Sequence, residues 1–162
     1  DGGFLAQWAG LNRGHNFIGV ERLLGRLRKL ERKGRRAQLE NLRMLRIEAG
    51  YFLQYLIPPQ TVTALHIYFP DPWPKRKHHG RRLLTPSFVQ VTGAALVPGG
   101  TIYLRTDDRL YFQAMIDCFG GSPLFSSVAT PDHLAAVLTD FERVFTARGI
   151  STLRAAYQRR SA

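Results

Sequence analysis

The sequence is short of cysteine, acidic side chains and long apolar runs. Its 162 residues include a single cysteine, Cys118, so the chain cannot form an internal disulfide. No run of eighteen or more apolar residues occurs, which predicts that no helix spans a membrane. The first residues, DGGFLAQWAG, lack the basic and then apolar layout of a signal peptide. Together these absences predict a cytoplasmic protein with a reduced thiol.

Basic residues far outnumber the acids. The chain has 23 Lys and Arg residues against 12 Asp and Glu residues, a formal net charge of +11 at pH 7. This excess predicts a polyanionic partner, nucleic acid before an acidic membrane surface. The charge is concentrated in residues 22–36 and 75–82. The first stretch carries leucines at helical spacing, which is typical of a solvated helix face, whereas the second has no such periodicity.

Short apolar runs alternate with amphipathic stretches along the whole chain. This alternation predicts an α/β protein with a parallel sheet covered on both faces, folded as a single domain of residues 1–162. We expect strands at residues 15–20, 42–47, 62–69, 101–105 and 151–157. We expect helices at residues 4–9, 22–36, 51–56, 87–96, 108–119 and 132–145.

An acidic residue follows each of the first four predicted strands. These acids are Glu21, Glu48, Asp71 and the pair Asp107 and Asp108. Because ligands of an open parallel sheet bind beyond the carboxyl ends of the strands, the acids predict a binding site along one rim. Each acid also has a local interpretation, either as a cap of the next helix or, at Asp71, as part of an ordinary turn. The joint placement of the acids favours a site.

The first residues contribute a possible cofactor loop. Gly2 and Gly3 precede an apolar helical segment, and Glu21 follows about twenty residues later. This is the separation expected between a nucleotide-binding glycine loop and the acid that binds ribose hydroxyls. The strand that would precede such a loop is missing from the sequence, so we expect the domain to be truncated at its N-terminus.

One segment, FPDPWPKRKHHGRR at residues 69–82, sets an acid between two prolines and runs on into basic residues. Together with NFIGVER upstream and LRTDD and LTDFERVFTARG downstream, it resembles the bacterial tRNA (guanine-N(7)-)-methyltransferases. The similarity runs in order over nearly the whole chain. It implies a Rossmann-like class I fold, S-adenosylmethionine as cofactor, and methyl transfer to N(7) of the tRNA variable-loop guanine at position forty-six.

The resemblance also implies roles for individual residues. Cofactor contacts fall on Glu21, Glu48 and Asp71, with Gly2 in the glycine loop; Glu48 stands where the family usually has Asp, which leaves its role open. Substrate contacts fall on Lys75, Asp107, Thr139, Asp140, Phe141 and Glu142. RNA contacts fall on Lys77, His78, His79, Gly80, Arg81 and Arg82, although Gly80 replaces a residue that is commonly basic.

Two sets of residues have a structural alternative to a role in binding. Thr139 followed three residues later by Glu142 also matches a helix capping box, and the residues alone favour that cap. Phe69 and Trp73 could stack on an extruded base or could close the core beneath the loop.

The proposed methyl transfer needs little acid or base catalysis from the protein. N(7) of guanine already has a free lone pair, so methyl transfer needs alignment, recognition of the guanine edge and compensation for the positive charge that arrives. We predict that Asp71 supplies recognition and charge, and that the nearby Lys75 keeps it ionised. The adjacent histidines and one distant cysteine do not make a metal site. The alternatives are a basic RNA-binding module without catalysis and a methyltransferase acting on another RNA.

Overall fold

The computed structural model describes residues 2–73 and 75–161, without the side chains of residues 76, 79 and 81. The chain forms two compact units. The first unit consists of the residues up to Ala49 together with Asp132–Arg148. The second consists of Gly50–Pro131 together with the residues from Gly149 onward. Whether the whole chain acts as one domain stays a prediction.

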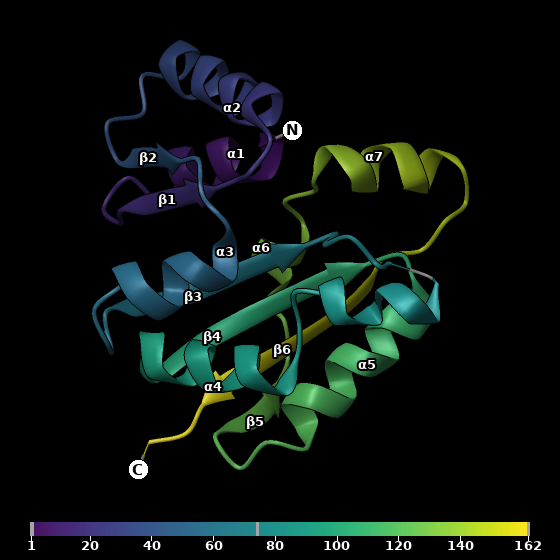
Figure 1. Cartoon of the computed structure of the whole chain (residues 1–162). Coiled ribbons are helices and arrows are strands. Elements are labelled where there is room, and N and C mark those ends of the chain that lie inside the picture. The colour runs from purple at the N-terminus through teal and green to yellow at the C-terminus, as the bar shows by residue number, and fades with distance from the viewer. Residues whose placement is uncertain (1, 74, 162) are drawn as a thin grey trace. The chain divides into compact units, whose positions relative to one another are not determined.

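The first unit is built on two parallel strands, β1 (Phe17–Val20) and β2 (Leu42–Leu45), in a register that pairs Phe17 with Leu42. Helices α1 (Gly3–Leu11) and α2 (Leu24–Arg36) pack beside this pair (Figure 1). Its core is a small cluster of Ala6, Ala9, Leu30 and Leu42. Two later helices, α6 (Asp132–Ala135) and α7 (Asp140–Ala147), complete the unit.

A glycine fixes the start of α1. Gly2 is the N-cap of the helix and has a φ of 76°, in the left-handed region that other residues rarely adopt. A Cβ at this position would lie 2.7 Å from the Cβ of Leu30 on α2. The glycine therefore allows the chain both to turn and to approach α2 closely.

The second unit holds a four-stranded sheet in the order β3-β4-β6-β5. Its strands are β3 (Val62–Tyr68), β4 (Leu96–Thr106), β5 (Phe125–Val128) and β6 (Leu153–Arg159). Strands β3 and β4 are parallel, whereas β6 runs antiparallel to both of its neighbours.

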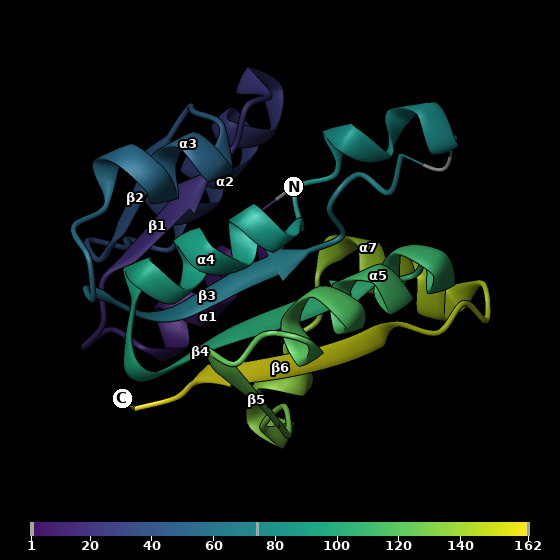
Figure 2. The ribbon, with the colours of Figure 1, turned by 60° about the horizontal axis from the view of Figure 1, so that its bottom comes forward.

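Helices cover one face of this sheet. Figure 2 shows α4 (Pro86–Ala95) and α5 (Arg109–Gly120) lying along it. A short helix, α3 (Ala49–Tyr51), continues into a π-helical turn at Phe52–Leu56 that packs against α4. Fully buried side chains from the strands and from α5 form the core, among them Ile102, Leu104, Met115 and Phe119.

The α/β fold class is confirmed, but four details of the expected pattern are wrong. The last predicted strand is antiparallel, and β5 was not predicted, because its sequence FSSV has little apolar character. The helix expected over residues 132–145 is two helices, since Thr139 caps a new helix at Asp140. Strand β4 begins at Leu96, inside the expected helix 87–96, because Leu96 pairs with Val62 of β3.

Among the described residues, no helix combines the length and the apolar character needed to cross a membrane.

Candidate active site

In the first unit, two acids follow the paired strands at the same edge. Strands β1 and β2 are parallel, and the Glu21 N–H donates to the carbonyl of Leu45 at the end of β2, 3.1 Å away. Glu48 follows β2 by three residues and has an exposed side chain. The carboxyl ends of β1 and β2 therefore present Glu21 and Glu48 at one edge, as the sequence predicts.

The second unit repeats this arrangement. The Phe69 N–H donates to the carbonyl of Arg105 at 2.8 Å, which aligns the ends of β3 and β4. Asp71 follows β3 and Asp107 follows β4, and both side chains are exposed. Within this unit, too, the two acids lie beyond the carboxyl ends of neighbouring parallel strands. That all four acids share one rim stays a prediction.

The chain around Asp71 is strained. Phe69 has a φ of 52° and Trp73 a φ of 44°, although neither residue is a glycine. A bulky residue in the left-handed region costs on the order of 1–3 kcal/mol, and such strain is concentrated at functional sites. The two strained residues stand on either side of Asp71. The backbone on both sides of Asp71 is therefore in a costly conformation.

The side chain of Arg82 contacts the backbone of the strained loop. Its Nε donates to the carbonyl of Pro72 at 2.7 Å, and its guanidinium lies 4.8 Å from the ring centroid of Tyr111 on α5. The Tyr111 hydroxyl in turn accepts a hydrogen bond from the Leu84 N–H at 3.3 Å. Burial raises the pKa of Tyr111, so this hydroxyl stays protonated at neutral pH. Arg82, expected as an RNA contact, therefore has an internal structural role.

The other described residues of the basic segment are mostly exposed. Lys75, Lys77 and Gly80 are exposed, and His78 packs edge-on against Trp73 with 5.8 Å between the ring centroids. No described residue forms an ion pair with Asp71, so the expected pairing with Lys75 is not seen among them. A Cβ at Gly80 would meet nothing within 4 Å, so the larger basic residue common in the family would fit there. The side chains of His79 and Arg81 lie outside the described residues.

The two acids after β4, Asp107 and Asp108, differ in their contacts. The Asp108 carboxylate accepts a hydrogen bond from the Tyr111 N–H at 2.8 Å and so caps α5. Asp107 is exposed and makes no polar contact with a described residue. The structure thus assigns the cap to Asp108 and leaves Asp107 available for a substrate.

Two residues of the neighbouring strands β3 and β4, the half-buried His66 and the buried Arg105, were not predicted as site residues. Arg105 is 1% exposed, and its guanidinium lies 4.2 Å from the ring centroid of Tyr68. His66 stacks on Tyr103 and lies 2.9 Å from the Tyr68 hydroxyl. Burial, with a smaller contribution from the Arg105 charge, lowers the pKa of His66 to about 4, so the imidazole is neutral at neutral pH. In the sequence, only the presence of an arginine inside an apolar strand indicates that these residues are unusual.

The Thr139–Glu142 stretch forms the capping box that the residues favour. The Glu142 N–H donates to the Thr139 hydroxyl at 3.0 Å, and the Thr139 N–H donates to the Glu142 carboxylate at 2.8 Å. Glu142 is fully buried, whereas Phe141 is 41% exposed. The capping interpretation is therefore confirmed, and a substrate contact of this stretch stays a prediction.

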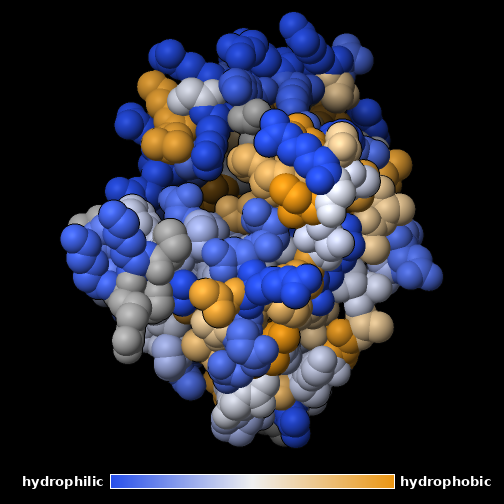
Figure 3. All heavy atoms as spheres, turned by 90° about the vertical axis from the view of Figure 1, so that its right-hand side faces the viewer, coloured by the Kyte–Doolittle hydropathy of each residue, from blue (hydrophilic) through white to orange (hydrophobic). Residues whose placement is uncertain are grey.

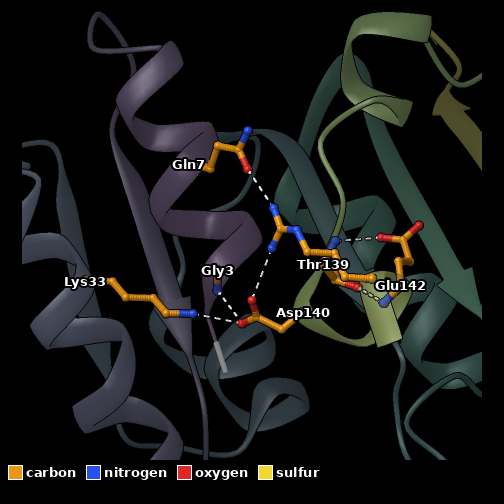
Figure 4. A network of polar contacts seen from close by, with 7 residues as sticks. Gly3, Gln7, Lys33, Thr139, Asp140 and Glu142 are labelled. Carbon is orange, nitrogen blue, oxygen red and sulfur yellow. Dashed lines mark hydrogen bonds and ion pairs between the residues drawn. The ribbon is translucent and has the colours of Figure 1, made fainter. Parts of the chain in front are cut away.

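Asp140 joins three helices of the first unit (Figure 4). Its Oδ2 accepts hydrogen bonds from the Gly3 N–H at 3.2 Å and from Lys33 Nζ at 2.8 Å. Its Oδ1 accepts one from Arg143, whose other nitrogen reaches the side chain of Gln7. The Asp140 carboxylate on α7 therefore accepts a hydrogen bond from a backbone N–H at the start of α1, beside Gly2. Through Lys33 it also connects α7 and α1 to α2.

We expect Asp140→Asn to destabilise the protein at neutral pH but not in acid. Burial pulls the pKa of Asp140 upward, but the hydrogen bond and charge of Lys33, with the Gly3 N–H, outweigh it and hold that pKa below its ordinary value of 3.8. Stability from a lowered pKa is present above 3.8 and is lost as the pH falls through the folded-state value. Urea unfolding from about pH 7 to about pH 2 measures the difference between variant and parent.

The matched control is Asp132→Asn, which removes an exposed carboxylate at the start of α6. The change of the stability difference with pH is expected to be larger for Asp140→Asn than for this control, because Asp132 forms no ion pair with a described residue. A difference for Asp140→Asn that does not shrink in acid would show that the carboxylate charge contributes nothing to the network.

The comparisons with known proteins decide the family. A family model described as "Putative methyltransferase" matches residues 1–156, almost the whole chain. The chain belongs to this methyltransferase family. The expectation drawn from the DPW segment and its flanking motifs is thereby confirmed.

Curated relatives of this methyltransferase are named tRNA (guanine-N(7)-)-methyltransferase. The one from Bordetella pertussis is 38% identical over 116 residues, which make up 72% of this chain and 46% of that protein. The one from Thermotoga maritima is 32% identical over 153 residues, 94% of this chain and 49% of that protein. The chain thus spans about half the length of the curated relatives it matches.

Solved structures of other methyltransferases share the fold. The 16S rRNA methyltransferase KamB has a TM-score of 0.70 at 14% identity, covering 99% of this chain and 84% of that chain. A geranyl diphosphate C-methyltransferase from Streptomyces coelicolor, solved with S-adenosyl-L-homocysteine, has a TM-score of 0.58 at 12% identity, covering 99% and 68%. The chain therefore has the Rossmann-like fold of these methyltransferases.

The first unit has an acceptor that suits this cofactor. Gly2 places a tight turn at the start of α1, where the Gly3 N–H already donates to the Asp140 carboxylate, so the contact that remains open is at the end of β1. The Glu21 carboxylate accepts a hydrogen bond from the Leu23 N–H at 2.8 Å and lies 3.6 Å from Arg26, but its side chain is still 28% exposed. An exposed carboxylate at the end of β1 can accept hydrogen bonds from ribose hydroxyls. The residues present therefore fit S-adenosylmethionine.

Among the described residues of the methyltransferase, no group of three or more His, Cys, Asp or Glu side chains is arranged to hold a metal ion.

Proposed function

We propose that the protein containing this chain is a tRNA (guanine-N(7)-)-methyltransferase that uses S-adenosylmethionine and acts on a guanine in the variable loop. The observation that carries the proposal is the strained FPDPW turn, which presents an exposed Asp71 at the carboxyl end of β3, directly before a basic segment. The names of the curated relatives support the same activity.

Asp71 fits the needs of methyl transfer to N(7). The cofactor supplies an electrophilic methyl group, which leaves the sulfonium sulfur as N(7) donates its lone pair, and no proton moves. Asp71 can accept hydrogen bonds from the N–H groups on the guanine edge, and its negative charge favours the cationic base that forms. Because N(7) needs no deprotonation, Asp71 acts by position and charge rather than as a base.

The basic segment after Asp71 fits the RNA backbone. The exposed Lys75 and Lys77 can contact phosphates, which fix the register of the RNA more than they read its sequence. Half-buried Trp73 lies between Asp71 and these lysines and offers a stacking surface for an extruded base. Asp107 lies at the end of the neighbouring strand, close enough in topology to take part in binding the same nucleotide.

The test combines calorimetry with a methylation assay. We expect the protein to bind S-adenosylmethionine without RNA and to convert the variable-loop guanine of a tRNA transcript to N(7)-methylguanine, detected by mass spectrometry of its nucleosides. A matched transcript with adenine at that position should remain unmodified. Binding of tRNA without binding of the cofactor would instead indicate an RNA-binding module, and methylation at another guanine would indicate a different RNA substrate.

A further inference from the structure

Helix α2 carries more positive charge than its place in the fold requires. Its sequence, LGRLRKLERKGRR, holds seven Lys or Arg residues and one acid. Leu30 and Gly34, four residues apart, form its buried side. This packing explains Leu30 but not the number of basic residues.

Some of these charges are neutralised within the first unit. Arg26 lies 3.6 Å from Glu21, Lys33 lies 2.8 Å from Asp140, and Arg35 lies 2.7 Å from Glu31. Three arginines form no ion pair or hydrogen bond with a described residue, and all three are exposed. They are Arg28, Arg32 and Arg36.

These three arginines, which we call the α2 ladder, share one face of the helix. They are spaced four residues apart, so neighbouring members are separated by about 6 Å along the axis. The ladder lies on the side of α2 away from Leu30 and Gly34. Figure 3 shows strongly hydrophilic side chains gathered at the top of the view, the end of the first unit where Figure 1 places α2.

The α2 ladder does not stabilise the helix. Like charges four residues apart destabilise a helix by a few tenths of a kcal/mol per pair. The helix dipole favours basic residues in the last turn, which accounts for Arg36 but not for Arg28, and the first turn of α2 contains no acid. A regular row of charges that opposes local stability is expected where a binding partner compensates for it.

We propose that the α2 ladder is a second phosphate-binding surface for RNA, separate from the segment at residues 75–82. The guanidinium fork of arginine matches phosphate, and a regular row of such forks suits a polymer that carries regularly spaced phosphates. A bilayer is less suited as a partner, because the exposed leucines here, Leu23 and Leu24, lie at the start of α2, whereas the turns that carry the three arginines have no exposed apolar side chain to insert.

The ion pair between Lys33 and Asp140 gives this surface a fixed position. It joins α2 to the start of α7, the stretch for which the family resemblance implies substrate contacts. RNA bound along the α2 ladder would thus be held in register with that stretch. The identity of the RNA as a tRNA rests on the proposed function, whereas the phosphate contacts do not.

The test measures tRNA binding by fluorescence anisotropy at several salt concentrations. We expect the triple variant R28Q/R32Q/R36Q to bind about tenfold more weakly, and the slope of log K against log[salt] to fall in magnitude by about 2–3. The triple variant R28K/R32K/R36K keeps the charge and should retain most of the slope. Circular dichroism confirms that α2 stays folded, as removal of like-charge repulsion predicts.

A matched pair of single variants separates the α2 ladder from overall charge. R32Q and R148Q each remove one charge from an exposed arginine whose side chain bonds to no described residue, but Arg148 lies outside α2. Only R32Q should lower the slope by about one. An equal loss in both variants would show that binding follows net charge alone and would overturn the proposal.

The outcomes are distinct from those of the proposed function. A protein that binds tRNA through the α2 ladder but transfers no methyl group would support the ladder and refute the proposed activity. Methyl transfer with tRNA binding unchanged in R28Q/R32Q/R36Q would refute the ladder alone. Vesicles of phosphatidylcholine containing phosphatidylserine serve as a further probe: loss of vesicle binding in this variant, with tRNA binding unchanged, would identify a membrane surface instead.

Discussion

Asp71→Asn is expected to lower the turnover of tRNA methylation by about 10²–10³-fold with S-adenosylmethionine at saturation. The substitution keeps the size of the side chain and leaves the turn between two prolines intact, but it removes the negative charge that favours a cationic base. Because phosphate contacts lie elsewhere in the segment, tRNA affinity should change little. Single-turnover rates, with protein in excess over tRNA, measure the chemical step directly.

The control for Asp71→Asn is Glu40→Gln, which removes an exposed carboxylate outside the proposed site and should leave turnover unchanged. Asp71→Glu is informative as well, since it keeps the charge and moves it outward. If position matters as the strained φ angles at Phe69 and Trp73 suggest, the glutamate should restore only part of the rate. Turnover near that of the parent for Asp71→Asn would refute the electrostatic role.

The strain around Asp71 is a feature that the sequence could not show. The string FPDPW predicts a turn through its prolines and marks Asp71 as unusual, but nothing in it distinguishes a relaxed turn from one with two bulky residues at positive φ. Backbone angles depend on what holds the loop from outside. Here that includes the Arg82 contact to Pro72, ten residues further along the chain.

Sequence periodicity located most elements but not the direction of the last strand. A strand has the same alternation of side chains whichever way it runs, so β6 could be placed near its true position yet paired in the wrong sense. Direction is decided by the neighbouring strands that β6 joins, and one of these, β5, has too weak an apolar pattern to be recognised.

Where the sequence allows two roles for a residue, the side-chain hydrogen bonds in the structure decide between them. The sequence allowed either Asp107 or Asp108 to cap α5, and only the hydrogen bond from the Tyr111 N–H identifies Asp108. In the sequence Arg82 looks like its basic neighbours, but in the structure its side chain donates to the Pro72 carbonyl of the loop. Composition can mark a basic segment as a surface for RNA. It cannot tell which of its members are used to build that surface.

Glu142→Ala is expected to lower the free energy of unfolding by roughly 3–5 kcal/mol, the largest stability effect of any single change considered. Glu142 has no exposed surface, and its carboxylate accepts the hydrogen bond of the buried Thr139 N–H. Alanine would remove the cap, leave that N–H without a partner and open a cavity at the start of α7. Urea unfolding, with the m-value checked for a constant change in exposed surface, measures the loss.

Glu142→Gln separates the cap from a substrate role. An amide oxygen can still accept the Thr139 N–H, as glutamine does in capping boxes, so we expect a loss of only about 1 kcal/mol and nearly unchanged methylation of tRNA. A fully buried carboxylate cannot reach RNA unless the start of α7 opens, so substrate contacts of this stretch should come from the more exposed Asp140 and Phe141. A stable Glu142→Gln protein with methylation reduced tenfold or more would contradict this, and would show that the charge of Glu142 acts on the substrate as well as on the helix.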